Sequence, residues 1–460
     1  MSDREPRVVA IVGAGFSGTA TAIHLLRQAN GRPLRVVLIE RAPEFGRGVA
    51  YARGTRSFLL NVPASRMSAT PGDPDDFLRF AQRRLPDSTG EDFLPRSLYG
   101  DYLQYLLETS AAKVPEGVTL ESWRGEVVDL TTVSDERMLV ALADGRSLIT
   151  NEVVLALGAQ LPRLPAGVSC SVEWPQLRKR PWAEGRALDG RDPLLVIGSG
   201  LTMVDVVCDA VDRHPGVVVH ALSRHGLVPP GQTAFRPDAL KDDGGVLVKS
   251  AGSARRLVAA ARQLAREAER CGGDWREAVT LVRRQAPGLW SSLSARERAR
   301  FLRHARAYWD IHRHRVPDVV SSRLEALRYS GQLTVHAGRL ASLDAVGDGV
   351  RATWRVRGSE ELRSLHAAEV VDCTGPDYHV ARSPEPLWKS LLARGLAMPD
   401  EHNLGIRTGA EGALVGRNGS ESNSVFYVGP MLRADHWEAT AVGELRIHAE
   451  QLARRLTQRG

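Results

Sequence analysis

The stretch RVVAIVGAGFSGTATAIHLL, residues 7–26, decides the fold of the first part of this chain. Residues 7–12 are apolar and rich in β-branched side chains, as in a buried parallel strand. A glycine-rich turn follows, and residues 19–27 are typical of a helix. A second apolar run, residues 34–39, predicts the next strand. We therefore expect a strand, a tight turn, a helix and a second parallel strand.

The turn itself, Gly-Ala-Gly-Phe-Ser-Gly, has the glycine spacing of a dinucleotide-binding turn. Gly13 permits the tight turn, Gly15 lets a pyrophosphate approach the backbone, and Gly18 lets the helix pack closely on the strand. The helix that follows would point its positive N-terminal end at the phosphates, and Phe16 and Ser17 within the turn are further candidate cofactor-binding residues. A glycine-rich surface turn is the alternative, but the order of the elements favours a dinucleotide site.

An acidic residue closes the second strand. Glu40 lies about 20 residues after Gly18, where a carboxylate can accept hydrogen bonds from an adenosine ribose. A carboxylate there repels a 2′-phosphate, so FAD or NAD(H) fits this site and NADPH does not. Arg41 follows immediately and could instead bind a phosphate, but residues 43–48 suggest that the chain turns away to cover a flavin. We keep Arg41 among the candidate cofactor-binding residues.

A second unit of the same kind begins within residues 193–211, PLLVIGSGLTMVDVVCDAV. Residues 194–197 predict a strand and residues 202–211 a helix. Met203 stands where the first turn has its third glycine, so this turn alone is a weaker signal. The candidate cofactor-binding residues of this turn are Gly198, Gly200, Leu201 and Thr202.

The strand that follows this helix, residues 217–222, ends differently from the first one. Ser223 and Arg224 stand where the first unit has Glu40. A hydroxyl and a guanidinium suit a 2′-phosphate, because arginine offers a planar pair of donors to phosphate oxygens. The second turn therefore predicts an NADPH site, with the alternative that Arg224 only caps a surface loop. His225 beside it is more typical of a solvated histidine.

Two further apolar strands are expected to return to the first sheet and to end near the flavin. They are residues 152–159 and 370–376, with Gly158 and Gly375 at their ends. The predicted fold class is α/β with two Rossmann-like dinucleotide-binding domains. The FAD domain is discontinuous, with residues 1–165 and 335–460, and the NAD(P)H domain spans 190–335. It includes a helical insert over about 238–330, which is rich in Ala, Arg, Leu and Glu.

Composition excludes several classes of protein. The four cysteines are far apart, which argues against a zinc site and a redox dithiol; they are Cys170, Cys208, Cys271 and Cys373. The net charge of +7 comes from scattered arginines without an aromatic stacking platform, which argues against a nucleic-acid partner. No apolar run approaches the roughly 18–20 residues of a membrane span. We expect a cytoplasmic enzyme that acts on a small molecule and could form a homo-oligomer.

Several longer stretches together resemble a known family. They are GRGVAY (46–51), LLNVPASRMSATPGDPDDFLRF (59–80), PRSLYGDYL (95–103), VIGSGLTMVDVV (196–207), RFLRHARAYWDIHRHRVP (300–317) and HWEATAVGELR (436–446). With the first turn, they resemble the YdhS-like group of FAD/NAD(P)-binding proteins, which are bacterial oxidoreductases. The layout is more distantly similar to the class B flavoprotein monooxygenases, which include N-hydroxylases and Baeyer–Villiger enzymes. Residues 171–182, SVEWPQLRKRPW, lack the F-x-G and the spaced histidine of the Baeyer–Villiger motif.

This resemblance implies an enzyme that uses FAD and NADPH as cofactors. It implies a monooxygenase that hydroxylates a small polar substrate, such as an amine or an amino acid, with molecular oxygen. Two alternatives stay open: an NAD(P)H-linked flavin oxidoreductase without oxygen insertion, and a non-catalytic nucleotide-binding sensor. Such a flavin enzyme requires positioning groups more than a protein nucleophile.

The candidate positioning groups lie on two segments. Asn61, the candidate catalytic residue, interrupts an apolar run and should lie near the flavin ring, with a turn-capping asparagine as the alternative. Arg66 and Ser68 on the same loop could contact flavin phosphate, ribose or an anionic substrate. Tyr51 could cover the flavin or fill the core.

Near the end of the chain, residues 425–428 predict a strand and a long helix is expected from about Glu438. In two-dinucleotide flavoproteins such a helix covers the flavin pyrimidine with its N-terminus. The candidate residues are Gly429, Trp437, Glu438 and Thr440, with packing as the alternative role of Trp437.

Histidines cluster between residues 304 and 314, on what is expected to be one helix. His312 and His314 are two positions apart and would point in opposed directions from a helix. His304 lies two turns from His312. We therefore predict no metal site.

Overall fold

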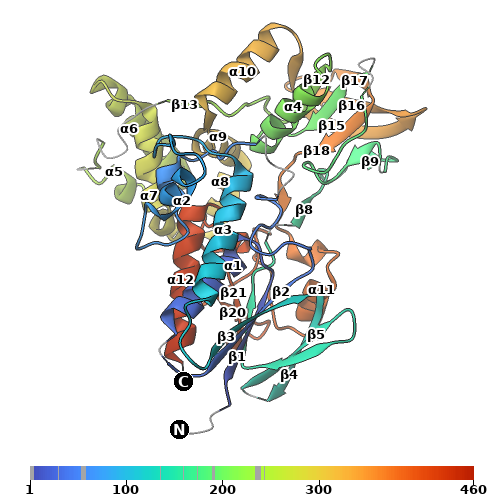
Figure 1. Ribbon diagram of the computed structural model, residues 1–460. Helices are drawn as coiled ribbons and strands as arrows, with labels where there is room; N and C mark the ends of the chain where they lie inside the picture. The colour runs from blue at the N-terminus through green and yellow to red at the C-terminus, as the bar shows by residue number, and fades with distance from the viewer. Residues whose placement is uncertain are drawn as a thin grey trace. The chain divides into compact units, whose positions relative to one another are not determined.

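The computed structural model describes residues 5–29, 31–52, 58–134, 136–158, 160–173, 175–188, 192–233, 240–242 and 244–459. The chain forms two compact units. The first comprises Met1–Ala159, Ala286–Ser291 and Tyr378–Gly460, and the second comprises Gln160–Gln285 and Ser292–Asp377. The first unit is thus discontinuous in sequence, as the colours along the chain in Figure 1 show.

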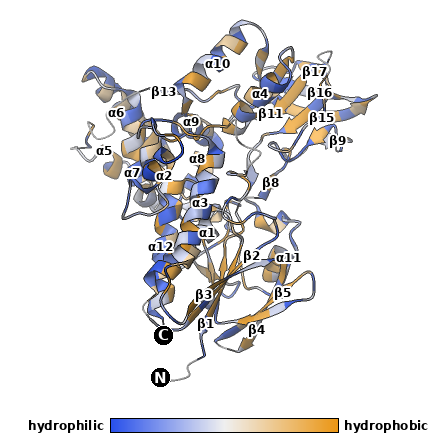
Figure 2. Ribbon diagram, viewed as in Figure 1, coloured by the Kyte–Doolittle hydropathy of each residue, from blue (hydrophilic) through white to orange (hydrophobic). Residues whose placement is uncertain are grey.

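The first unit is built on a six-stranded sheet with the order β20-β21-β7-β1-β2-β3. The strands are β1 (Arg7–Val12), β2 (Leu34–Glu40), β3 (Val118–Arg124), β7 (Glu152–Leu155), β20 (Ala413–Val415) and β21 (Glu421–Tyr427). Only β20 is antiparallel to its neighbour. β1, β2 and β7 are largely buried, as their apolar sequences predict, and Figure 2 shows much of this sheet in hydrophobic colours.

Helices pack on this sheet. α1 (Phe16–Gln28) contacts both α3 (Arg96–Ala111) and α12 (Val442–Gln458), and Figure 1 shows the three together. These neighbours bury α1 from Phe16 to Leu26. The other elements are α2 (Asp76–Gln82), α11 (Pro386–Ala393), the 3-10 segments η2 (Ala64–Arg66), η3 (Val380–Arg382), η4 (Ala410–Gly412) and η5 (Pro430–Ala434), and the antiparallel strands β4 (Val127–Ser134), β5 (Arg137–Leu142) and β6 (Ser147–Thr150).

The second unit is built on a sheet whose main path is β10-β18-β11-β12-β15-β16-β17. These strands are β10 (Leu177–Arg178), β11 (Leu194–Ile197), β12 (Val219–Ser223), β15 (Leu333–Val346), β16 (Gly349–Val356), β17 (Leu362–Ala367) and β18 (Glu369–Asp372). The pairs from β10 to β15 are parallel, and β15, β16 and β17 are antiparallel. Shorter strands are β8 (Gln160–Pro162), β9 (Ser169–Cys170), β13 (Gly231–Gln232), β14 (Val316–Pro317) and β19 (Pro376–Asp377).

Most of the helices that follow β11 lie between β13 and β15. They are α5 (Val246–Lys249), α6 (Ala254–Arg270), α7 (Trp275–Ser292), α8 (Ala295–His304), α9 (Arg306–Arg313) and α10 (Asp318–Tyr329), whereas α4 (Leu201–Arg213) joins β11 to β12. The single helix expected to carry His304, His312 and His314 is therefore wrong. Ala305, with φ of −115°, departs from helical geometry and separates α8 from α9.

The strand expected at residues 370–376 belongs to the second sheet and not to the first. Its ordered part is β18, which pairs in parallel with β11 and places Val370 opposite Leu195. A short, fully apolar strand fits the middle of any parallel sheet, so its sequence does not specify its neighbours. The second unit consequently extends to Asp377, beyond the boundary expected near residue 335. Residues 159, 190 and 238, which bounded other expected segments, lie outside the described residues.

In each sheet, the order of the strands reverses at the strand that carries the glycine turn. In the first, the chain passes from β1 through α1 to β2, while β7 pairs with the other side of β1. In the second, it passes from β11 through α4 to β12, while β18 pairs with the other side of β11. Ligands of open parallel sheets bind at such switch points, beyond the carboxyl ends of the strands. The predicted fold class, α/β with two Rossmann-like units, is confirmed.

Two candidate dinucleotide-binding sites

The first glycine turn is fixed by close backbone packing. Gly13 has φ of +102°, and a β-carbon on it would overlap the carbonyl oxygen of Ala156, just after β7. A β-carbon on Gly18 would overlap the carbonyl oxygen of Gly13 itself. The Gly13 amide donates to the Ile39 carbonyl at 2.8 Å. Both glycines are therefore required by the fold of the turn, apart from any ligand.

Gly15 has a different role in the same turn. A β-carbon there would meet only the α-carbon of Gly48, at an ordinary 3.7 Å. Gly15 is the N-cap of α1, and no side chain caps the first turn, which contains Phe16 and Ser17. By contrast, Ser253 caps α6. Glycine at the N-cap leaves the first amides of α1 available to an anion.

The carboxylate of Glu40 lies against this turn. Its Oε2 accepts a hydrogen bond from the Ala14 amide and its Oε1 accepts one from the Ala42 amide, both at 2.8 Å. The Gly46 amide donates to the Ala14 carbonyl at 2.9 Å, which brings the segment after β2 back to the turn. The acid predicted to bind the ribose is thus positioned at the turn by two backbone amides.

Arg41 is held by other carboxylates of the first unit. Its guanidinium lies 2.5 Å from Glu385 and 3.6 Å from Glu126. The hydrogen bond to Glu385 raises the pKa of Arg41 above its ordinary value. These partners favour a surface ion-pair role, so we do not retain Arg41 as a candidate phosphate ligand.

The segment that follows residue 58 contains three of the predicted residues. Asn61 is half-buried and Arg66 is exposed in η2. Ser68 is buried, and its hydroxyl donates to the carbonyls of Asp73 and Thr70, at 2.6 and 3.0 Å. The Ser68 side chain therefore closes a local turn, which gives it a structural role that the sequence did not reveal.

An aromatic cluster lies beside the first turn of α1. The ring of Tyr51 is 4.7 Å from that of Tyr99, and Tyr99 is 6.3 Å from Phe16. Burial raises the pKa of Tyr51 to about 12, so its hydroxyl stays protonated. The sequence analysis did not identify Tyr99 as a member of this cluster. Its position three residues before Tyr102, on the same face of a helix, could have indicated it.

The second turn repeats the geometry of the first at its first glycine. Gly198 has φ of +112°, and a β-carbon on it would overlap the carbonyl oxygen of Cys373, just after β18. Gly200 is the N-cap of α4 and has open space around it. Leu201 and Thr202 form the half-buried first turn of α4. The amides at the start of α4 are thus presented as those of α1 are.

Met203 replaces the third glycine and is fully buried in the core of the second unit. Gly18 at the matching position of α1 lies directly against the backbone of Gly13. At this position α4 therefore packs through the Met203 side chain, whereas α1 packs through backbone atoms. The weaker sequence signal of this turn therefore reflects a different helix–strand contact.

At the end of β12, Ser223 supports the second turn. Its Oγ accepts hydrogen bonds from the Ser199 hydroxyl at 2.8 Å and from the Gly226 amide at 3.0 Å. Arg224 is exposed beside it. Ser223 thus links the two segments that would surround an adenosine ribose, and Arg224 is the neighbouring cation.

Gly158 and Gly375 follow the strands next to each turn. Gly158 has φ of +66° and lies after β7 in the first unit. Gly375 has φ of +91° and lies after β18 in the second unit, whereas the sequence predicted that its strand belongs to the first sheet. In the part of the chain that the structure describes, no other atom lies near the missing β-carbon of either glycine.

The last group of predicted flavin-site residues, between positions 429 and 440, lies just before α12 in the sequence. α12 begins at Val442 and not near Glu438, because residues 435–440 form turns in which the Thr440 amide donates to the Glu438 carbonyl at 2.6 Å. Gly429 has φ of +144°. Trp437 is buried between the Trp290 ring at 4.7 Å and the Arg433 guanidinium at 3.8 Å. Glu438 is also buried.

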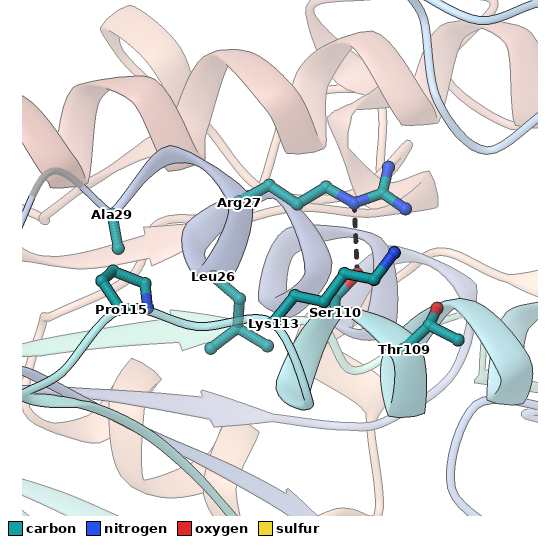
Figure 3. A pocket seen from close by; sticks show the side chains of 7 residues that line it. All are labelled: Leu26, Arg27, Ala29, Thr109, Ser110, Lys113 and Pro115. Carbon is teal, nitrogen blue, oxygen red and sulfur yellow. Dashed lines mark hydrogen bonds between the residues drawn. The ribbon is translucent and has the colours of Figure 1, made fainter.

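A surface hollow of about 410 Å³ in the first unit lies elsewhere. Figure 3 shows Arg27 and Lys113 at its rim, with Arg27 donating to the Ser110 hydroxyl at 3.1 Å. It lies at the C-terminal end of α1, about 20 Å along the helix from the glycine turn. This hollow is therefore not the predicted flavin site.

The described residues contain no group of three or more potential metal ligands. His312 lies in α9, where its Nδ1 is 2.7 Å from the Tyr308 carbonyl, and His304 ends α8. None of the described helices is both long and apolar enough to span a bilayer.

A family model matches the first part of the chain. This model, described as FAD-NAD(P)-binding, matches residues 10–160, which run from within β1 to the first residue of β8. No curated protein matches the chain.

Solved structures match over its whole length. The ornithine N-hydroxylase of Kutzneria sp. 744 has a TM-score of 0.64 and 16% identity, over 99% of this chain and 100% of that one. The L-lysine 6-monooxygenase of Pseudomonas syringae has a TM-score of 0.66 and 18% identity, over 99% of both chains. The cadaverine monooxygenase of desferrioxamine biosynthesis from Erwinia amylovora has a TM-score of 0.63 and 15% identity, over 99% of this chain and 95% of that one. At these identities the similarity establishes a shared fold.

Proposed function

We propose that this protein is an FAD- and NADPH-dependent monooxygenase that hydroxylates an amine or the side-chain amine of an amino acid. The observation that carries the proposal is the pair of glycine turns, each at the switch point of its own parallel sheet. The first ends its second strand in Glu40 and the second in Ser223 and Arg224, so the two sites differ in charge. Different charge suits two different dinucleotides.

The first unit is the proposed FAD site. The uncapped amides of α1 would hold the pyrophosphate, and Glu40 would accept from the adenosine ribose. Gly15 fits this role, since no packing contact with the described residues requires a glycine there. When bound, the flavin supplies hydride acceptance and oxygen activation. Asn61, Gly158, Gly429, Trp437, Glu438 and Thr440 remain proposed flavin-site residues, and Arg66 remains a proposed contact for an anionic group.

The second unit is the proposed NADPH site. Gly200, with open space around it, and the first amides of α4 would hold the pyrophosphate. Ser223 and Arg224 would face the 2′-phosphate. Leu201 and Thr202 would lie beside the phosphates at the start of the helix.

The substrate class is supported by the relatives. The structures that match over the whole chain include enzymes for L-lysine and cadaverine, and one with FAD, NADP+ and L-ornithine. The motifs quoted from the sequence support a place in the YdhS-like group. Small-molecule amines and molecular oxygen are therefore the proposed reactants.

The test is a product analysis with labelled oxygen. The flavin-loaded protein is given NADPH and ¹⁸O₂ with L-ornithine, L-lysine, cadaverine or a wider panel of amines. A hydroxylated product that carries ¹⁸O supports the proposal. Consumption of NADPH with release of peroxide and no labelled product across the panel would favour the reductase alternative. Failure of NADPH and NADH alike to reduce the flavin anaerobically would overturn the proposed function.

A further inference from the structure

Three chain segments meet at the end of β12 in the second unit. Ser223 pairs with Ala337 of β15, and the missing β-carbon of Gly226 would lie 3.1 Å from the Ala337 side chain. The amide of Arg357, just after β16, donates to the Ala337 carbonyl at 3.0 Å. The loop after β12 and the end of β16 therefore both contact Ala337 of β15.

Each of these segments contributes an arginine. Arg224 follows β12, Arg339 lies two residues beyond Ala337 on β15, and Arg357 follows β16. All three are exposed, and none forms an ion pair with a carboxylate in the part of the chain that the structure describes. Like charges gathered on one surface create a positive potential that attracts an anion.

Neighbouring arginines on the same sheet behave differently. Arg355 pairs with Glu360 and Arg363 with Glu361, each at 2.8 Å. These two arginines thus have carboxylate partners, whereas Arg224, Arg339 and Arg357 have none among the described residues. This contrast argues against a merely solvated face.

The imidazole of His225 lies close enough to Arg224, Arg339 and Arg357 to be affected by their charges. Burial lowers the pKa of His225 below its ordinary value, and the charges of Arg357, Arg224 and Arg339 lower it further. All three guanidinium groups thus act on one ring. The Nδ1 atom of His225 is buried and has no hydrogen-bond partner among the described residues.

We propose that Arg339 and Arg357 act with Arg224 as specificity-determining residues that bind a phosphomonoester, the 2′-phosphate of NADPH. This inference rests on the proposed function of the second turn and extends it to two strands far from that turn in sequence. A phosphomonoester carries close to two negative charges at neutral pH, and planar guanidinium groups can each donate two hydrogen bonds to it. Three arginines from three segments would therefore distinguish NADPH from NADH.

The test measures binding of nucleotide fragments to the flavin-loaded protein by calorimetry. The probes are 2′,5′-ADP, which carries the phosphate, and 5′-AMP, which lacks it. We expect wild type to prefer 2′,5′-ADP, and Arg339→Ala and Arg357→Ala each to weaken it about tenfold, the loss of one charge-assisted contact. Binding of 5′-AMP should change by less than about twofold.

Arg363→Ala is the matched control, because it removes an exposed arginine of the same sheet that already has a partner. It should leave both affinities unchanged. Arg339→Glu and Arg357→Glu should abolish the preference for 2′,5′-ADP while the melting temperature stays that of wild type. Wild-type affinities for the two arginine-to-alanine variants, or equal binding of both probes by wild type, would overturn this inference. Failure of the proposed function is distinguishable, because the flavin would then not be reduced by either nicotinamide nucleotide.

Discussion

The amide of Ala14 donates a hydrogen bond to the carboxylate of Glu40 at 2.8 Å, so the end of β2 is tied to the middle of the first glycine turn. The carboxylate that would recognise a ribose is therefore fixed by the same backbone that would receive the pyrophosphate. The predicted ribose-binding and pyrophosphate-binding parts of the first site are thus joined by the hydrogen bond between Ala14 and Glu40.

Replacing Glu40 with Gln tests this coupling. A neutral amide is a weaker acceptor than a carboxylate, so the affinity of the protein for FAD should fall about tenfold. Titration of apoprotein with FAD, followed by flavin fluorescence, measures the change. Glu385→Gln removes a carboxylate of the same unit that pairs with Arg41, and it should leave FAD affinity unchanged. Equal effects of the two variants would show that only net charge matters.

Alanine at Gly15 and alanine at Gly18 should have separable effects. The β-carbon at Gly18 overlaps the Gly13 carbonyl, so Gly18→Ala should lower the stability of the apoprotein by about 1–3 kcal/mol. At Gly15 it meets only an ordinary contact, so Gly15→Ala should leave the apoprotein stable and weaken FAD binding. Melting temperatures with and without FAD distinguish the two. A strongly destabilised Gly15→Ala apoprotein would contradict this assignment.

His24 should make the protein sensitive to acid. Burial, then the charge of Arg27, lowers the pKa of His24 from 6.5 to about 4, and His24 is only 3% exposed in α1. The folded state thus favours neutral imidazole, and stability present above pH 6.5 is lost as the pH falls towards 4. The loss should be on the order of 3 kcal/mol, since one pKa unit corresponds to about 1.4 kcal/mol.

The measurement is the melting temperature of His24→Leu and wild type between pH 8 and pH 4, a range chosen to span roughly both pKa values. The leucine variant should lose less stability on acidification than wild type. His304→Leu, at an exposed position, serves as the control. Parallel pH profiles of His24→Leu and wild type would rule out this role of His24.

Glu369→Gln should destabilise the second unit. The Arg178 guanidinium lies 2.9 Å from the Glu369 carboxylate, and the two side chains are 6% and 1% exposed. Removing one partner of a buried pair leaves an uncompensated charge, which costs about 3–5 kcal/mol. Glu361→Gln removes a pair exposed on the same sheet and should cost less than about 1 kcal/mol. Chemical denaturation compares the two, and similar losses would contradict the expected effect of burial.

The local elements followed closely from the sequence. The apolar strands β1 and β11 and the two glycine turns lie where pattern and spacing predict them, whereas α1 begins at Phe16, ahead of the helix expected from residue 19. Gly13 and Gly198 were identified because a positive φ at a tight turn restricts the residue type. Such features depend on neighbours in the chain, which the sequence displays directly.

The sequence erred where the decisive contact was distant. β18 was assigned to the wrong sheet because an apolar strand does not specify its partners. Arg41 stayed among the candidate cofactor-binding residues because Glu385, its ion-pair partner, lies far away along the chain. Ser68 and the true start of α12 at Val442 depended on turn hydrogen bonds that no periodicity reveals.

The sequence by itself determined that this chain has two glycine turns, one followed by an acid and the other by a base. Tertiary structure alone decided that both lie at switch points, and that Arg339 and Arg357 join Arg224 at the end of β12. The physical reason is that spacing fixes local backbone geometry, whereas charges far apart in sequence meet only when strands pair.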